Sequence, residues 1–361
     1  MMLRLDWTLI VAWALVVGLG VVMVASSAMA MSSMFVVRHG VYLLIGLVAC
    51  ALVLSIPLAL WEKTHRLAWL VAVVLCALVL VPGVGVEVNG ARRWIGLSGF
   101  TVQASELAKF LVLVYLAGYL ARFADSLGES AGALLRPLGM IGVVGLLLLL
   151  EPDFGSVVVL GVAASGMLFV AGARLRHFLL LVGAIAALFV LLAVVQPYRL
   201  ERLVSFTDPW AFAYGSGYQL TQALIAFGRG EITGLGLGEG IQKLFYLPEA
   251  HNDFIFAVIA EELGLLGAVA VVGLFALLVV RILRTARAAL GERRAFAGYL
   301  TYGVGLLLGI QCLINFGVNT GVLPTKGLTL PFVSFGGNSL VVSCAMVGLV
   351  LRAQLEGSGR G

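Results

Sequence analysis

Apolar runs, separated by short polar segments, recur from one end of the chain to the other. At about 1.5 Å per residue, a helix formed by such a run can cross the roughly 30 Å hydrocarbon core of a membrane. Because no stretch between the runs suits a soluble domain of ordinary size, we predict an all-α polytopic membrane protein with residues 1–361 in one membrane domain. About ten transmembrane helices are expected, over residues 7–28, 40–56, 67–82, 105–121, 137–151, 153–172, 177–195, 254–280, 296–320 and 338–352.

The basic residues orient these helices, because Lys and Arg in short loops are retained on the cytoplasmic side of a membrane. If the N-terminus is inside, fourteen Lys and Arg residues lie on the cytoplasmic face, and the short outer loops hold only Arg38, Arg92, Arg93 and Lys326. Both termini are therefore predicted to be cytoplasmic. We interpret the first run as an anchor and not as a removed signal peptide, since only Arg4 precedes it and no small-residue cleavage site with a soluble chain follows.

One connection is long: residues 196–253 form a predicted extracytoplasmic loop. A loop of this length in a compact protein is usually functional or disordered, and its many aromatic residues argue that it is folded. Residues 219–229 are predicted to form a short amphipathic helix that could lie on the membrane surface. Four alternating glycines match neither a Rossmann nor a P-loop pattern. They predict either a structural turn or a nest of backbone amides that binds phosphate: Gly234, Gly236, Gly238 and Gly240.

Composition narrows the class of protein. Apolar residues make up 61% of the chain and charged residues 11%, against about 25% charged in a soluble domain. The net charge of +5 comes from short clusters between apolar runs, and no basic stripe with interleaved aromatic residues indicates nucleic-acid binding. The four cysteines lie in apolar runs, without disulfide or zinc spacing. The sequence contains neither an HExxH metal motif nor a nucleophile triad.

Charged residues at membrane depth are candidates for function, because they are rare there and usually paired or functional. Glu106 and Lys109 lie on one face of the predicted fourth helix, after Ser105 as its expected N-cap. They form either an ion pair that holds the bundle or a site in which Lys109 neutralises an anionic ligand. For Glu261 and Glu262, two turns into the eighth helix, we favour structural pairing, because no proton relay accompanies them.

Two further pairs lie near the predicted outer surface. Arg92 and Arg93, next to Trp94, form either an interfacial anchor or a phosphate clamp, for which the guanidinium group is well suited. Glu151 and Asp153 cap helices, hold a cation or order the arginines.

Asp253 ends the long loop directly before an apolar helix. Taken alone, an aspartate at this place is predicted to be the helix N-cap. His251 is the one histidine near this polar cluster.

Several motifs together resemble a known family. They are NGARRWI at 89–95, SELAK at 105–109, EPDFG at 151–155, LPE at 247–249 with His251, DFIF at 253–256, EELG at 261–264, LPF at 330–332 and GG at 336–337. The chain resembles, over nearly its whole length, the SEDS proteins (shape, elongation, division and sporulation), which are bacterial peptidoglycan glycosyltransferases. Residues 321–331, with the Thr325-Lys326 pair, are more similar to division members than to elongation members. The departures remove no group that is charged at pH 7: Ala104, Asn252, Phe335 and Asn338 stand where Pro, Thr, Tyr and Ser are usual.

The resemblance implies polymerisation of lipid II into glycan strands on the outer face of the cytoplasmic membrane, during septal cell-wall synthesis. The new bond would invert configuration, so no covalent intermediate is needed. Asp253 matches the essential aspartate of the family and is the expected general base. The candidates for binding pyrophosphate and sugar are Arg92, Arg93, Lys109, Lys243, Lys326 and His251, supported by Glu106, Glu151, Asp153 and Glu249.

The resemblance also implies partners and a location. The expected partners are lipid II and the undecaprenyl-pyrophosphate-linked glycan, a class B penicillin-binding transpeptidase of the FtsI type, and the regulators FtsQ, FtsL and FtsB. The expected location is the division septum of the inner membrane. No cofactor is implied, and a divalent cation, Mg²⁺ or Mn²⁺, stays open.

Two other functions fit parts of the pattern. A transporter that flips the lipid-linked precursor would use the charges at membrane depth, but the internal repeat typical of many transporters is absent from the sequence. A membrane scaffold that recruits division proteins would need no catalytic group at Asp253. Scaffolding and catalysis can coexist.

Overall fold

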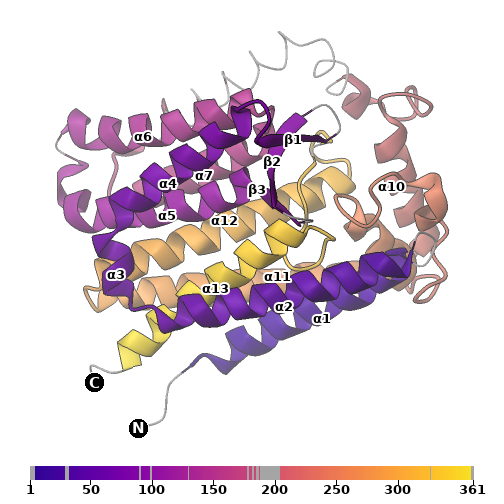
Figure 1. The fold of residues 1–361 in the computed structure, drawn as a ribbon. Coiled ribbons are helices and arrows are strands. Elements are labelled where there is room, and N and C mark those ends of the chain that lie inside the picture. The colour runs from indigo at the N-terminus through magenta and orange to yellow at the C-terminus, as the bar shows by residue number, and fades with distance from the viewer. Residues whose placement is uncertain are drawn as a thin grey trace.

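The computed structural model describes residues 5–28, 32–88, 91–97, 100–128, 130–176, 179–180, 183, 187, 204–325 and 327–358. Most of these residues form long helices that run side by side (Figure 1). Both ends of the described chain lie toward one end of this bundle, together with the short helix α3 (Leu58–Lys63). The helix α10 (Tyr218–Gly230) lies toward the other end.

The helical membrane architecture predicted from the apolar runs is confirmed. Among the described residues, seven helices are long and apolar enough to cross a membrane: α1 (Trp7–Ala28), α2 (Ser33–Ser55), α5 (Ala104–Phe123), α6 (Ala131–Leu150), α11 (Ile255–Gly291), α12 (Ala295–Asn319) and α13 (Gly337–Ser358). Two shorter apolar helices are α4 (His65–Leu80) and α7 (Phe154–Val170). These helices match every predicted run except 177–195, most of which lies outside the described residues.

The helix ends that differ most from the prediction are the start of α2 and the end of α11. α2 begins before residue 40, because Ser32 caps it and its side chain accepts a hydrogen bond from the backbone N–H of Met34. α11 continues past residue 280 to Gly291, because its last turns, rich in Arg, Ala and Leu, consist of good helix formers. The charge of the arginines ends the apolar run but not the helix.

The segment between α4 and α5, predicted only as a loop, contains a small antiparallel sheet. Its strands lie in the order β1 (Gly85–Val88), β2 (Ala91–Leu97) and β3 (Phe100–Gln103). The pairing aligns Gly85 with Ile95 and Trp94 with Gln103, and the β-branched and aromatic residues of these strands favour it. β2 carries both Arg92 and Arg93, so the sheet fixes them relative to the start of α5.

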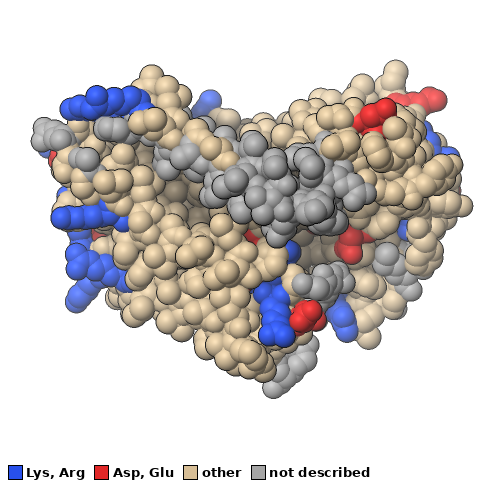
Figure 2. Space-filling view, turned by 90° about the horizontal axis from the view of Figure 1, so that it is seen from above, with Lys and Arg blue, Asp and Glu red and all other residues tan. Residues whose placement is uncertain are grey.

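The interior of the bundle is built around α5. This helix is buried over most of Ala104–Leu120 and packs against α4, α7 and α12. The outer helices α1, α2 and α11 expose large apolar side chains such as Leu15, Leu44 and Leu266, as helices in contact with lipid do. Figure 2 shows that Lys and Arg gather toward the left end of the molecule, where α5 ends and α6 begins in Figure 1.

Candidate active site

Asp253 lies in a turn directly before α11. The helix begins at Ile255 and its cap position is Phe254, so the prediction of Asp253 as the N-cap is wrong. The backbone N–H of Ala257, in the first helical turn, donates to Oδ1 of Asn319 in α12, at 3.1 Å, and to the carbonyl of Phe254, at 3.0 Å. The Asn319 side chain thus supplies an acceptor to the start of α11 from a neighbouring helix.

Two buried asparagines of α12 hold the backbone of Asp253. Its carbonyl oxygen accepts hydrogen bonds from Nδ2 of Asn315, at 3.0 Å, and from Nδ2 of Asn319, at 2.9 Å. The two asparagines are four residues apart and share a helix face, and neither exposes more than 1% of its surface. Nδ2 of Asn315 also donates to the carbonyl of Leu328, at 2.7 Å, which ties the connection between α12 and α13 to the same point.

This connection passes directly beside the carboxyl group of Asp253. A Cβ atom at Gly327 would lie 3.0 Å from Oδ2 of Asp253, so glycine keeps the space beside the carboxyl group free of a side chain. Oγ of Ser334 donates to the carbonyl of Asn252, at 2.6 Å, which fastens the far side of the turn. Lys326, one residue before Gly327, lies outside the described residues.

His251 packs against two aromatic rings that also contact each other. Its imidazole ring is 5.2 Å from the ring of Phe35 and 5.8 Å from that of Phe335, centroid to centroid. Nδ1 is buried and has no hydrogen-bond partner among the described residues. Burial lowers the pKa of His251, so the ring stays neutral at pH 7. Glu249 accepts a hydrogen bond from the side chain of Asn252 in the same turn.

Glu106 and Lys109 form the ion pair that the sequence predicted as one alternative. Nζ of Lys109 lies 2.9 Å from Oε1 of Glu106, and the Lys109 side chain is fully buried. The prediction of Ser105 as the N-cap is wrong, because α5 begins at Ala104 with Gln103 at the cap position. Oγ of Ser105 accepts a hydrogen bond from Nε2 of Gln103 instead.

Arg92 and Arg93 differ in their surroundings. Arg92 pairs with Glu87 across β1 and β2, at 3.2 Å, and both side chains are about half exposed. Arg93 donates from Nε to the carbonyl of Glu151, at 3.2 Å, and from Nη2 to the carbonyl of Pro152, at 2.7 Å. Through these bonds Arg93 fixes the turn between α6 and α7. Since both acceptors are uncharged carbonyl oxygens, they do not neutralise the guanidinium group.

Glu151 and Asp153 have different roles in that turn. Asp153 caps α7, as one of the predictions had it: its carboxylate accepts from the backbone N–H and from the hydroxyl of Ser156. Glu151 has no exposed surface, and neither of its carboxyl oxygens accepts a hydrogen bond from a described N–H or O–H group. Burial, and next the charge of Asp153, raises the pKa of Glu151 to about 8.

The long loop inserts its backbone into a break in α11. The helix is interrupted at Gly264, whose φ of +68° lies in the left-handed region. There the amides of Leu235 and Gly236 donate to the carbonyls of Glu261 and Glu262, each at 3.0 Å. Backbone groups freed by a break at membrane depth need such partners, so the loop and the helix complete each other.

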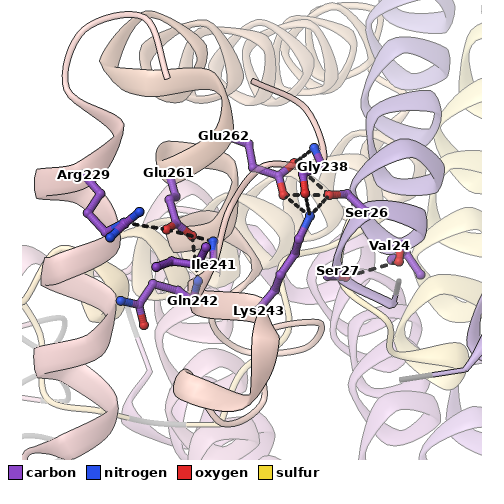
Figure 3. A network of polar contacts seen from close by, with 10 residues as sticks. All are labelled: Val24, Ser26, Ser27, Arg229, Gly238, Ile241, Gln242, Lys243, Glu261 and Glu262. Atoms are coloured by element: carbon purple, nitrogen blue, oxygen red, sulfur yellow. Dashed lines mark hydrogen bonds and ion pairs between the residues drawn. The ribbon is translucent and has the colours of Figure 1, made fainter. Parts of the chain in front are cut away.

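A buried network joins this loop to α1 and α11 (Figure 3). Nζ of Lys243 lies 2.6 Å from Oε1 of Glu262, 2.8 Å from Oγ of Ser26 and 2.7 Å from the carbonyl oxygen of Gly238. An ammonium group has three N–H donors, and these three acceptors use all of them. Lys243, predicted as a pyrophosphate ligand, therefore neutralises Glu262 inside the protein in this structure.

The neighbouring carboxylate, Glu261, has its own set of donors. Its oxygens accept from Nε of Arg229 and from the backbone amides of Ile241 and Gln242, each at 3.1 Å. The structural pairing predicted for both glutamates is confirmed. In the glycine-rich segment, Gly238 N donates to Oε2 of Glu262 at 3.0 Å. This amide therefore binds one of the chain's own carboxylates.

The predicted amphipathic helix is α10, which buries Leu220, Ala223 and Ala226 and packs against α11, with the ring of Phe227 5.7 Å from that of Phe256. Asn315 and Asn319 were not predicted from the sequence. A signal was available, because Gln311, Asn315 and Asn319 recur every four residues within the apolar run 296–320 and therefore form one polar stripe.

Comparison with known proteins places the chain in a family. A model of the FtsW, RodA and SpoVE proteins, described as a cell cycle protein family, matches residues 5–358. A probable peptidoglycan glycosyltransferase FtsW of Halomonas elongata is 54% identical over 359 residues, which cover 97% of this chain and 90% of the relative. The corresponding protein of Nitrosococcus halophilus is 52% identical over 358 residues, covering 97% and 92%.

Solved structures agree. One, titled "Structural coordination of polymerization and crosslinking by a peptidoglycan synthase complex", has a TM-score of 0.81 and 32% identity, and covers 98% of this chain and 99% of that chain. Thermus thermophilus rod shape determining protein RodA has a TM-score of 0.72 and 29% identity, covering 98% and 97%. The division-type resemblance of residues 321–331 is confirmed by relatives that carry the FtsW name. The chain belongs to the FtsW, RodA and SpoVE family of cell cycle proteins.

Proposed function

We propose that this protein is a peptidoglycan glycosyltransferase that polymerises lipid II on the outer face of the inner membrane, during septal synthesis. The observation that carries the proposal is the placement of Asp253. Two buried asparagines hold its backbone, and Gly327 leaves the space beside its carboxyl group open. Relatives at 46–54% identity are named as probable peptidoglycan glycosyltransferases.

The reaction requires a base and a stabilised leaving group. The acceptor sugar hydroxyl attacks an anomeric carbon, a C–O bond forms there, and the bond to the pyrophosphate breaks on the opposite face with inversion. Asp253 takes the hydroxyl proton, a contribution typically worth about 10²–10⁴ in rate. The electron pair of the broken bond leaves with the lipid pyrophosphate, whose growing negative charge needs preorganised cations.

Arg93 is the best-supported of the described cations for this role. Its partners are carbonyl oxygens, so no carboxylate competes with a phosphate for its charge. Arg92 pairs with the exposed Glu87, and an exposed pair contributes little, about 0–1 kcal/mol, so it can exchange its partner. Lys326 belongs to the proposal by resemblance alone.

Two predicted ligands have closer partners inside the protein, and the third, His251, lies among aromatic rings. Lys243 is saturated by Glu262, Ser26 and Gly238, and we leave it out of the substrate site. Lys109 is fully buried against Glu106, so we assign this pair to shaping the bundle beside the site. His251, neutral and packed against the rings of Phe35 and Phe335, would contact sugar and not phosphate.

The pairing of the charges at membrane depth also weighs against a transporter. Glu106, Glu261 and Glu262 each have a basic partner within 3.1 Å. They are therefore not part of a chain of exchangeable proton sites.

The proposed membrane topology rests on the sequence. The distribution of basic residues supports cytoplasmic termini and an outer loop at 196–253.

The solved structure with a TM-score of 0.81 is titled as a peptidoglycan synthase complex that coordinates polymerization and crosslinking. This supports a class B transpeptidase as partner. FtsQ, FtsL and FtsB follow from the division-type resemblance. Among the described residues no group of three or more His, Cys, Asp and Glu side chains has the arrangement to hold a metal ion, and we assign no residue to a cation.

The test is Asp253→Asn in the purified full chain with its transpeptidase partner. The amide keeps the shape and loses the base, so we expect lipid II polymerisation to fall at least about 100-fold while the melting temperature is preserved. Asp208→Asn, a change in an exposed loop aspartate, is the matched control and should polymerise normally. Near-normal polymer from Asp253→Asn would overturn the assignment.

A further inference from the structure

A cavity of about 520 Å³ opens between α4 and α6, over the last turns of α5. It is far from the candidate active site: α5 starts beside β3, and Phe123 at the cavity is nineteen residues further along the helix than Ala104, or about 28 Å. The large apolar side chains around it are at least half exposed: Leu67, Leu70 and Leu135. The mouth of the cavity therefore lies on the surface that faces lipid.

Two arginines line opposite walls of this cavity. Arg66 comes from α4 and Arg136 from α6. Tyr115 and Tyr119 of α5 form the floor between them, and both arginines line the same cavity. Neither arginine has an ion-pair partner in the part of the chain that the structure describes. The cavity thus carries two unneutralised positive charges above an apolar floor.

Three polar groups of the lining already have partners inside the protein. The Tyr119 hydroxyl donates to the carbonyl of Ala133, at 2.7 Å, and Nε1 of Trp69 donates to the carbonyl of Met140, at 2.8 Å. Nδ1 of His65 lies 2.8 Å from the carbonyl oxygen of Glu62. Tyr115 is only 4% exposed and lines the cavity, yet its hydroxyl makes no hydrogen bond among the described residues, so a ligand in the cavity can accept one from it.

We propose that this cavity is a binding site for an anionic phospholipid. The phosphate lies between Arg66 and Arg136, where guanidinium groups match phosphate oxygens two at a time, and the Tyr115 hydroxyl donates to a third oxygen. An acyl chain follows the apolar wall formed by Trp69 and Leu70. Basic pockets between transmembrane helices bind lipid headgroups by this combination of charge and apolar surface. The volume suits a headgroup and the first part of a chain.

The experiment uses the purified full chain in detergent, stripped of lipid, and measures the melting temperature against added lipid. We expect phosphatidylglycerol to raise it in a saturable way, and phosphatidylcholine or inorganic phosphate to leave it unchanged. The double variant R66Q/R136Q should bind phosphatidylglycerol about thirtyfold more weakly, at about 1 kcal/mol for each arginine. The matched control is R284Q/R287Q, two exposed arginines of α11 without a described ion-pair partner, which should keep the wild-type response.

A second variant keeps the test valid if the double variant folds poorly. Tyr115→Phe keeps the ring and removes only the hydroxyl, so it should fold as the wild type does and bind phosphatidylglycerol about fivefold more weakly, the worth of one hydrogen bond. The proposal is overturned if the α11 control loses the response as fully as R66Q/R136Q. It is equally overturned if phosphatidylcholine or inorganic phosphate reproduces the shift, or if Tyr115→Phe binds normally.

Discussion

Nζ of Lys243 lies 2.6 Å from Oε1 of Glu262, and neither side chain exposes more than 1% of its surface. The pair connects the long loop to α11 at the depth of the break at Gly264. Ser26 of α1 contacts both members, since its hydroxyl lies 2.7 Å from the Glu262 carboxylate and 2.8 Å from Nζ. Three segments far apart in the sequence thus meet at one buried charge pair.

Removing one member of this pair should be costly. Lys243→Met leaves the buried carboxylate of Glu262 without its cation, and we expect the free energy of unfolding to fall by about 3–5 kcal/mol. The double variant Lys243→Met with Glu262→Leu should lose less free energy of unfolding than Lys243→Met alone, because it leaves no buried charge of this pair unpaired. Thermal unfolding in detergent measures both, with the exposed Lys63→Met as control. Equal losses for Lys243→Met and Lys63→Met would contradict the network.

Asn319 is expected to influence catalysis through the position of Asp253. Asn319→Ala removes one of the two hydrogen bonds of the Ala257 N–H, which keeps the carbonyl of Phe254 as acceptor, and one of the bonds to the carbonyl of Asp253. We expect a cost of about 1–3 kcal/mol in stability. Because small misplacements of a base slow proton transfer, turnover should fall about tenfold or more with KM nearly unchanged. Thr320→Ala, one residue on and exposed, is the control. An unaltered kcat in Asn319→Ala would remove this positioning role.

Glu151 should make the stability of the protein depend on pH. Its folded pKa of about 8 lies above the ordinary value of 4.5, so between these two values the folded state holds a proton that the unfolded state has lost. The free energy of unfolding therefore falls as pH rises through this window, by up to about 1.4 kcal/mol per pH unit.

Glu151→Gln cannot ionise and should lack this slope. We expect the variant to match the wild type near pH 5 and to be more stable than the wild type at pH 8, as melting curves across the range would measure. Parallel curves for the two proteins would show that Glu151 is ionised in the fold.

The Glu106 and Lys109 pair offers a test that separates structure from turnover. Glu106→Gln leaves a fully buried ammonium group without its counter-charge, so the melting temperature should fall markedly, as for any broken buried pair. Turnover per folded molecule should stay within about threefold, because the proposed reaction uses neither group directly. A melting temperature equal to that of the wild type, with polymerisation lost, would instead place Lys109 on the substrate.

Much of the helix arrangement could be predicted because the hydrocarbon layer requires apolar runs of a certain length. The sheet between α4 and α5 was missed, since its strands are short and lie between two dominant helical signals, although Asn89-Gly90 is a typical hairpin dipeptide. Motifs indicated which stretches meet at the site. The partners of Lys243 and Arg93 could not be predicted, because a sequence pattern does not show that a cation is already used by a carboxylate or a carbonyl elsewhere in the fold.

The contact between Ser26 and Lys243 joins residues 217 positions apart, which has a consequence for how the protein is made. At a synthesis rate of about 5–20 residues per second, α1 waits on the order of 10–40 seconds before Lys243 has been synthesised. Glu262, Asn315 and Asn319 follow later still. The nascent chain therefore inserts most of its helices before the groups that hold Asp253 exist, and the acid acquires its final position only near the end of translation.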